Sequence, residues 1–344
     1  MYASFKKHTL QFITPGGTSR GVLHTKDSWL IFIESKAKSR EPGIMGIGEC
    51  SIIPKLSIDD VPELENVIEK TVKQINENNF SIVNFPSSLT KFPALRFALE
   101  MALLDLKNGG TRTLFPSAFT QGKAAIPING LIWMGDFDAM WKQAEQKFKD
   151  GFSVLKMKIG ALDFDEEMYF IAQLRRHFPQ IELRLDANGG FPLEEAPERL
   201  EALAQFRIHS IEQPIKQGNI SRMAALCRRS PIDIALDEEL IGVEVQRAAS
   251  LLKEIKPKYV ILKPSLLGGF QVSDEWIAAA ESQHIRWWAT SALESNIGLN
   301  AIAQWTFTKN NLLPQGLGTG GVFSNNIEMG LKVERGELKC VCHQ

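Results

Sequence analysis

The stretch GFSVLKMKIG (residues 151–160) places Lys156 and Lys158 two positions apart inside an otherwise apolar segment that glycines flank. In a β-strand, side chains alternate between the two faces, so both lysines would share one face with Val154. Taken alone, this segment favours an antiparallel strand with one face in water. The segments on either side of it favour a different arrangement.

Short apolar runs return along the chain at a period of about 25–30 residues, the length of one βα unit. With residues 154–160 they are the runs 126–133, 181–190, 209–215, 233–240, 258–266, 285–293 and 311–321. Apolar spacing of three or four predicts helices between them, for example over 168–178 and 243–255. Another helix is predicted to begin at Ser273 as its N-cap, and Pro197 suits only a first turn. Eight strands favour a closed βα barrel over an open doubly wound sheet, and no G-x-G-x-x-G follows the first of them.

The residues before the barrel follow another pattern. A strand is predicted over residues 28–36, and helices are predicted over 65–77 and 93–109. Residues 14–21 and 40–49 are rich in glycine and proline and are predicted to be loops. Strands followed by helices indicate an α+β domain in front of the barrel. The tail 330–340 is too short to fold alone and is expected to pack on this first domain.

Composition excludes several classes of partner. The chain has 344 residues, 44% of them hydrophobic and 23% charged, with a net charge of -1. This balance gives no electrostatic reason to expect a nucleic acid or a membrane as partner. No apolar run reaches the ~18–20 residues that span a bilayer, the first residues lack the apolar core of a signal peptide, and the four cysteines are scattered. The cytoplasm is therefore the expected compartment, and the oligomeric state is left open.

Polar residues fall at the same place in each predicted unit. The ends of the strands carry, in chain order, Lys156 with Lys158, Asp186, Glu212, Asp237, Lys263 and Ser291. From Lys158 onward the intervals are 28, 26, 25, 26 and 28 residues, which is the strand period itself. A single acid at such a position is more often the N-cap of the next helix. Helix capping does not explain three successive carboxylates flanked by lysines.

Three carboxylates on neighbouring strands, ~4.8 Å apart, would repel one another and raise their pKa values. A divalent cation would remove this conflict. An oxygen ligand set without histidine or cysteine favours Mg²⁺ first and Mn²⁺ second. Lysines gathered near such an ion would have lowered pKa values, so that one amine could act as a base. An amine beside a metal-bound carboxylate suits removal of the proton α to that carboxylate, with the ion stabilising the ene-diolate.

The motifs KMK, DAN, EQP, DEE and KP, in this order and spacing, resemble the enolase superfamily, which pairs a lysine base with magnesium. More narrowly they resemble its muconate lactonizing enzyme subgroup, and the resemblance covers nearly the whole chain. It implies an α/β fold with a (β/α)7β barrel over residues 123–321 and an N-terminal α+β capping domain over residues 1–122. Residues 322–344 would be a C-terminal segment that packs on the capping domain.

Within the subgroup, the details resemble the o-succinylbenzoate synthase family of menaquinone biosynthesis, whose members are lyases. The resemblance implies that Lys158 takes the α-proton and then, as its ammonium form, helps the β-hydroxyl to leave. Lys263 would stabilise the dienolate from the other face of the ring. Asp186, Glu212 and Asp237 would be the magnesium ligands.

The same resemblance implies a set of substrate contacts. Lys156 would neutralise the substrate carboxylate and hold down the pKa of Lys158. Ser291 and the backbone near Gly318 and Thr319 would contact the succinyl carboxylate. The segments 18–23, which contains Arg20, 46–57 and 291–299 are similar to the loops that cover the substrate in that family.

Other functions remain as alternatives. An N-succinylamino acid racemase or a dipeptide epimerase would use both lysines as bases on opposite faces. Dipeptide epimerases resemble one another in an Asp-x-Asp at the eighth strand, where this chain has GLGTG (316–320), which counts against dipeptides. A Schiff-base aldolase would leave the three carboxylates without a purpose. A non-catalytic binding protein would not be expected to retain all five motifs.

Overall fold

Parallel strands surrounded by helices form the larger part of the molecule, which we describe from a computed structural model for residues 1–18, 21–35, 43–80 and 85–341. Within these residues the strands lie side by side in the order β11-β10-β9-β8-β7-β6-β5. They are β5 (Gly130–Ile132), β6 (Val154–Lys158), β7 (Glu182–Asp186), β8 (Ser210–Glu212), β9 (Ile234–Leu236), β10 (Tyr259–Leu262) and β11 (Arg286–Ala289). Since β6 pairs in parallel with both β5 and β7, the antiparallel interpretation of residues 151–160 is wrong.

The ring of strands is closed by the segment predicted as the eighth strand. Isolated parallel bridges join Gln315 to Ile128 and Gly316 to Thr290, so this segment lies between the two edges of the sheet. The backbone N–H of Gly316 donates to Ala289 O at 2.8 Å, which continues the ladder of β11. The predicted closed barrel is confirmed, although its last strand is reduced to single bridges.

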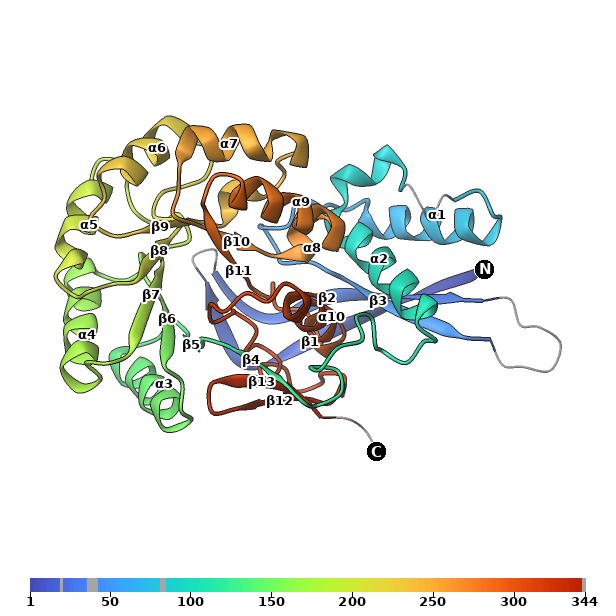
Figure 1. Ribbon diagram of the computed structural model, residues 1–344, viewed down its shortest axis with the longest axis horizontal. Helices are drawn as coiled ribbons and strands as arrows, with labels where there is room; N and C mark the ends of the chain where they lie inside the picture. Colours follow the sequence, from blue (N-terminus) through green and yellow to red (C-terminus); the bar gives the residue numbers. More distant parts are fainter. Residues whose placement is uncertain (19–20, 36–42, 81–84, 342–344) are drawn as a thin grey trace.

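Helices follow the strands and cover the outside of the barrel (Figure 1). They are α3 (Phe137–Lys149), α4 (Phe164–His177), α5 (Ala196–Ala204), α6 (Ile220–Arg229), α7 (Ala248–Ile255), α8 (Pro264–Leu267), α9 (Phe270–Glu281) and α10 (Asn296–Thr308), with short 3₁₀ turns η2 (Glu238–Leu240) and η3 (Val245–Arg247). Asp136 and Asp163 cap α3 and α4 with their side chains, and Pro197 lies in the first turn of α5. The predicted cap at Ser273 is wrong: α9 begins at Phe270, and Ser273 Oγ donates to Gly269 O inside the helix.

The capping domain is an antiparallel sheet covered by two helices. The strands are β1 (Tyr2–Thr18), β2 (Gly21–Glu34) and β3 (Met45–Ser51), the helices are α1 (Leu64–Asn76) and α2 (Pro93–Lys107), and the 3₁₀ turn η1 (Ser87–Lys91) lies between them. The loops predicted for residues 14–21 and 40–49 are therefore wrong for residues 14–18, 21 and 45–49, which lie in strands, and hold for residues 43 and 44. Gly16 and Gly17 pair with Leu23 and Val22 of β2, after a shift of register between Gln11 and Gly16.

Close packing joins β3 to α2. A Cβ on Gly46 would run into the carbonyl oxygen of Ala102, and a Cβ on Gly48 would run into that of Ala98. The backbones of strand and helix can approach this closely because neither glycine has a side chain. Most apolar residues of the sheet and of both helices form one buried cluster, whereas Leu30 of β2 and Phe97 and Met101 of α2 belong to the core of the barrel.

The end of the chain contacts both parts of the molecule. The N–H of Ile13 on β1 donates to Val322 O at 3.0 Å, so the start of the last segment lies on the capping domain. The hairpin of β12 (Leu331–Glu334) and β13 (Glu337–Cys340) pairs with β4 (Ala125–Pro127), which directly precedes β5. The predicted packing of residues 330–340 on the first domain stays a prediction, as do the domain boundaries. Among the described residues, no helix combines the length and the apolar character needed to cross a membrane.

Candidate active site

The acidic and basic side chains that were predicted to converge meet at the carboxyl ends of the strands. Lys158 ends β6 and is in register with Asp186 at the end of β7, which is in register with Glu212 at the end of β8. Asp237 follows β9, and Lys263 follows β10. Parallel strands in register bring their ends to one edge, so the common period of the sequence does place these residues together.

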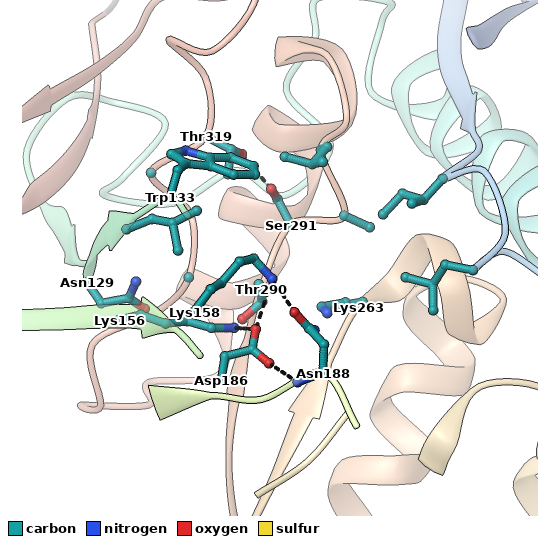
Figure 2. Close-up of a pocket in the computed structure, with 17 residues that line it drawn as sticks. Asn129, Trp133, Lys156, Lys158, Asp186, Asn188, Lys263, Thr290, Ser291 and Thr319 are labelled. Atoms are coloured by element: carbon teal, nitrogen blue, oxygen red, sulfur yellow. Dashed lines mark hydrogen bonds and ion pairs between the residues drawn. The ribbon is translucent and has the colours of Figure 1, made fainter. Parts of the chain in front are cut away.

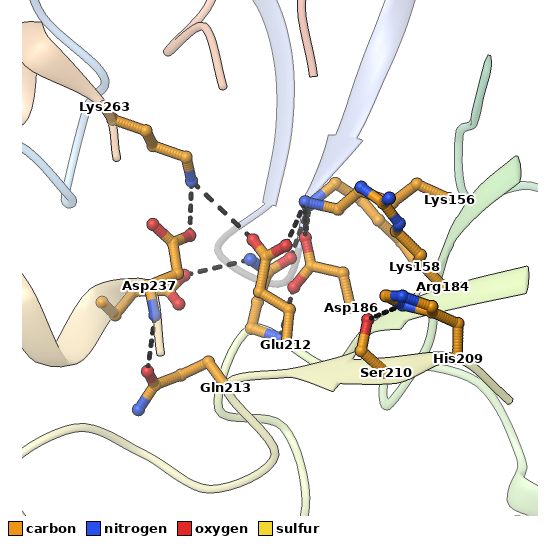
Figure 3. A network of polar contacts seen from close by, with 12 residues as sticks. Lys156, Lys158, Arg184, Asp186, His209, Ser210, Glu212, Gln213, Asp237 and Lys263 are labelled. Carbon is orange, nitrogen blue, oxygen red and sulfur yellow. Dashed lines mark hydrogen bonds and ion pairs between the residues drawn. The ribbon is translucent and has the colours of Figure 1, made fainter. Parts of the chain in front are cut away.

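The ammonium groups of the lysines lie between the carboxylates (Figure 3). Lys156 Nζ lies 2.6 Å from Glu212 Oε2 and 3.0 Å from Asp186 Oδ2. Beyond Glu212, Lys263 Nζ donates to Asp237 Oδ2 and lies 4.0 Å from Glu212 Oε1. All five residues are at most 9% exposed, so neighbouring side chains, rather than water, compensate their charges.

These charges and their burial shift the pKa values of the group. Burial and the charge of Asp186 raise the pKa of Glu212 to about 8, although Lys156 opposes them. Burial also disfavours the charged form of Asp186, but Lys156 and Lys158 outweigh it and hold its pKa well below the usual range. Burial alone would lower the pKa of Lys156 and Lys263, yet the adjacent carboxylates raise both above the ordinary value. The expectation of lowered pKa values concerns lysines beside a bound divalent ion, and it stays a prediction.

The carboxylates supply oxygen ligands, but the ammonium groups lie among them. Within the described part of the chain, no three acidic, histidine or cysteine side chains are grouped closely enough to hold a metal ion. One oxygen atom is nevertheless suited to be a ligand of a cation. Glu212 Oε1 is buried and has no hydrogen-bond partner among the described residues. An all-oxygen donor set with such an atom suits a hard divalent ion. The assignment of Asp186, Glu212 and Asp237 as metal ligands stays a prediction.

A pocket with about 730 Å³ of empty space, its open mouth included, lies at this end of the barrel (Figure 2). The barrel contributes Asn129, Leu131, Trp133, Lys156, Lys158, Asp186, Asn188, Lys263, Thr290, Ser291, Ala292, Leu293, Gly316, Gly318 and Thr319 to its lining. The capping domain contributes Ile53 and Leu56. The two lysines predicted to be catalytic thus open into one pocket, and the capping domain forms part of its wall.

The predicted substrate contacts fall on the same pocket where the structure describes them. Ser291 Oγ and Thr319 Oγ1 form a hydrogen bond of 2.5 Å, and Gly318 lies beside them in the lining. Lys156 also lines the pocket, although its ammonium group is engaged by carboxylates. Arg20 lies outside the described residues. The roles of all these residues stay predictions.

Asn188 is a site residue to which the sequence analysis gave no role. Its Oδ1 accepts a hydrogen bond of 2.6 Å from Lys158 Nζ, and its backbone N–H donates to Asp186 Oδ1 at 3.0 Å. Its Nδ2 donates to Glu238 Oε1 at 3.0 Å. The backbone at Asn188 has a φ of 44°, a conformation that asparagine tolerates better than most residues. The motif DAN contained the signal, but the sequence does not show that the side chain turns back toward Lys158.

The apolar part of the lining was also missed. Trp133 follows β5 and carries no polar signal, while Ile53 and Leu56 belong to the segment 46–57 that resembles a covering loop. Chemically, the pocket offers amines that can take or give a proton, the carboxylate of Asp186 and apolar walls. Such a site suits a reaction in which a small organic anion loses a proton next to its carboxylate.

Comparisons with known proteins agree with this geometry. The family described as enolase C-terminal domain-like matches residues 139–340 of the chain. The o-succinylbenzoate synthase of Desulfotalea psychrophila (strain LSv54 / DSM 12343) is 44% identical over 368 residues, covering 98% of this chain and 98% of its own.

Solved structures give the same result. The crystal structure of MenC from Desulfotalea psychrophila LSv54 matches with a TM-score of 0.86 and 42% identity, covering 98% of this chain and 99% of that chain. The L-Ala-D/L-Glu epimerase from Bacillus subtilis matches with a TM-score of 0.85 and covers 99% of this chain and 96% of its own. At 19% identity this second match shows a common fold.

Proposed function

The chain belongs to the enolase superfamily, and we propose that it catalyses the dehydration of 2-succinyl-6-hydroxy-2,4-cyclohexadiene-1-carboxylate to 2-succinylbenzoate. It is a carbon-oxygen lyase that acts in menaquinone biosynthesis. The observation that carries this proposal is the 44% identity to an o-succinylbenzoate synthase along 98% of both chains. A likeness confined to the barrel would support the general chemistry, whereas this one includes the capping domain.

Lys158 is the base in our proposal. It removes the proton α to the carboxylate, and its ammonium form then gives a proton to the β-hydroxyl group, which leaves as water from the same face. The hydrogen bond from Lys158 Nζ to Asn188 supports this role, because it holds the amine at the pocket. Lys263 lies beyond Glu212 and Asp186 from Lys158, so its charge would stabilise the dienolate from the other side (Figure 3).

Enzymes of the enolase superfamily use a divalent metal, and Mg²⁺ is the ion we propose here, with Mn²⁺ as a substitute. Asp186, Glu212 and Asp237 would hold it, and the Oε1 of Glu212, which accepts no hydrogen bond from the described residues, supports this assignment. When bound, the ion would stabilise the extra negative charge that proton removal places on the substrate carboxylate. Lys156 and Lys263 contact the same carboxylates, so their ammonium groups would compete with the ion for these oxygens.

Substrate contacts follow from the pocket. We propose that Lys156 offsets the charge of the reacting carboxylate and that Ser291, with the backbone near Gly318 and Thr319, binds the succinyl carboxylate. The hydrogen bond between Ser291 and Thr319 supports a shared role. Arg20, from the segment 18–23, is proposed to contact the ligand from the capping domain.

The partner of this protein would be a small carboxylate, with no nucleic acid or membrane, and its location would be the cytoplasm. A direct assay tests the proposed activity. The purified protein with Mg²⁺ is given the succinyl cyclohexadiene substrate, a panel of N-succinyl amino acids and L-Ala-L-Glu. We expect 2-succinylbenzoate to form with a kcat/KM far above that for epimerisation, and Lys158→Ala is the control without activity. Epimerisation of a dipeptide or an N-succinyl amino acid without any dehydration would contradict the proposal.

A further inference from the structure

Glu49, on β3 of the capping sheet, is a buried acid that the proposed mechanism does not use. Its side chain is 0% exposed, and its Oε1 accepts a hydrogen bond of 2.8 Å from Ser28 Oγ on β2. The same oxygen accepts the backbone N–H of Ser295 in the barrel at 2.9 Å. Oε2 accepts Ser295 Oγ at 2.5 Å and the N–H of Gly298 at 3.0 Å. One carboxylate of the capping domain thus binds the N-terminus of α10, where the helix dipole favours negative charge.

The surroundings of Glu49 are built for this contact. A Cβ on Gly298 would lie 3.0 Å from Glu49 Oε2 and 2.6 Å from the Cβ of Glu294, so a side chain there would keep the carboxylate away. Lys26 on β2 is 1% exposed and donates a hydrogen bond to Ser51 Oγ. The negative charges of Glu49 and Glu294 interact favourably with its ammonium group. The interface between capping sheet and barrel therefore contains a closed group of charges, all shielded from water.

Two segments that line the pocket, the turn 52–57 and the loop 291–295, are connected to Glu49 and its partners. On the capping side, β3 runs directly into residues 52–57, a turn closed by hydrogen bonds from Leu56 N to Ile53 O and from Ile53 N to Ser57 Oγ. Ile53 and Leu56 of this turn line the pocket. On the barrel side, the loop 291–295 leads into α10, and its residue Ala292 packs with Ile53 and Leu56 in one apolar cluster with Leu266.

We propose that Glu49 is a positioning residue that sets the affinity of the pocket for its substrate. Its carboxylate fixes the loop 291–295 and the turn 52–57 relative to each other, so that both walls are in place before the ligand arrives. Glu49 contacts neither Lys158 nor Lys263. Its substitution should therefore weaken substrate binding and leave the rate of the chemical step unchanged. The inference rests on the proposed function for the identity of the ligand.

Glu100 provides a matched control. It lies on α2 of the capping domain and accepts the N–H groups of Phe270 at 2.5 Å and Gln271 at 3.1 Å, at the N-terminus of α9. Glu100 therefore also joins the capping domain to the first turn of a barrel helix. Neither Glu100 nor these partners line the pocket. A substitution at Glu100 weakens the interface without touching the pocket walls.

Steady-state kinetics of Glu49→Gln and Glu100→Gln on the succinyl cyclohexadiene substrate test the proposal. Glutamine keeps the size of the side chain but turns an amide toward N–H and O–H donors. For Glu49→Gln we expect KM to rise about tenfold or more, with kcat within about threefold of the wild type. For Glu100→Gln we expect a lower melting temperature and an unchanged KM. An unchanged KM in Glu49→Gln, or an equal rise in both variants, would overturn the proposal.

Hydrogen exchange gives a readout that does not depend on the substrate. Amides of residues 52–57 and 291–295 should exchange faster in Glu49→Gln and at the wild-type rate in Glu100→Gln; equal exchange in all three proteins would overturn the inference. If the wild type does not convert the succinyl cyclohexadiene substrate, the proposed function fails. The hydrogen-exchange rates still test whether Glu49 fixes residues 52–57 and 291–295. If Glu49→Gln does not fold, Ser295→Ala replaces it, and unchanged exchange of residues 52–57 in that variant would contradict the proposal.

Discussion

Lys158 and Lys263 differ in their partners, which indicates different tasks. Lys158 Nζ is held by Asn188 Oδ1 at 2.6 Å and by Asp186 Oδ2 at 3.2 Å, and it opens into the pocket. Lys263 is engaged by Asp237, with Glu212 next to it. A base must lose its proton during turnover, whereas a residue that stabilises a dienolate must keep its charge. Substitutions that retain charge but remove basicity separate these two roles.

Arginine at each position is the first test. A guanidinium group cannot act as a base at neutral pH, so Lys158→Arg should abolish turnover as completely as Lys158→Ala. Lys263→Arg keeps a cation at the dienolate and should retain measurable dehydration, whereas Lys263→Ala should lose most of it. The measurement is kcat of the four variants on the succinyl cyclohexadiene substrate. Equal and complete loss in both arginine variants would favour a two-base scheme.

The metal assignment is tested apart from activity. We expect Mg²⁺ to bind to the wild type in a calorimetric titration without substrate, and Asp186→Asn or Glu212→Gln to weaken that binding strongly. Glu182→Gln is the control, because Glu182 begins β7 at the opposite end of the barrel and pairs with Arg184. Dialysis against EDTA should abolish turnover, and Mg²⁺ should restore it. Full activity in the metal-free protein would exclude these ligands.

At the scale of the elements, acidic side chains from one segment repeatedly cap the helix of another. Asp59, in the loop after β3, accepts the N–H of Ala94 at 2.8 Å in the first turn of α2. It is 0% exposed, and its Oδ1 has no hydrogen-bond partner among the described residues. Burial raises its pKa to about 7, because the backbone donors only partly replace water.

This carboxyl should make stability depend on pH. In the unfolded chain Asp59 ionises near its ordinary pKa, while in the folded protein it keeps its proton up to about pH 7. The contribution of the group is therefore fully present at acid pH and is lost as the pH rises toward 7. Asp59→Asn keeps an acceptor for Ala94 and removes this loss, which is at most about 4 kcal/mol at ~1.4 kcal/mol per pKa unit.

Urea unfolding of wild type and Asp59→Asn at pH 5 and pH 8 measures the effect. The free energy of unfolding of Asp59→Asn minus that of the wild type should be larger at pH 8 than at pH 5. The exposed neighbour Asp60, changed to asparagine, is the control. The same difference between wild type and Asp59→Asn at both pH values would show that Asp59 does not titrate in this range.

The elements also show where local sequence signals were sufficient. The helix predicted over 168–178 is α4 within a few residues, because its apolar stripe faces the strands directly. The glycine-rich residues 14–18 were predicted as a loop but lie in β1, paired with β2. Glycine permits many conformations, so the partner strand decides which one is adopted. At Ser273 a residue typical of a cap lies inside a helix that begins earlier, where Glu100 of another domain supplies the capping oxygen.

At the scale of the whole molecule, the barrel is closed through Gly316. A Cβ at this position would lie 2.8 Å from Thr290 Cγ2 and 3.0 Å from Thr290 Cβ, whereas a Cβ on Gly318 would meet nothing nearer than 3.5 Å. Gly316→Ala should therefore lower the free energy of unfolding by about 1–3 kcal/mol, and Gly318→Ala should change it by less than ~1 kcal/mol. Urea unfolding of both variants checks this, and equal stability would show that the closure can adapt.

The barrel, its family and the row of charged residues at its mouth could be predicted from the sequence. Each βα unit repeats one geometry, so a constant period from Lys158 to Ser291 already fixes their common edge. The three-dimensional fold was needed to see how those charges pair, that Asn188 holds Lys158, and that Glu49 joins the capping sheet to the loop 291–295. Such contacts form between segments up to about 250 residues apart. The spacing of residues along the chain does not predict these contacts, because buried charged groups interact with whichever groups the fold brings close to them.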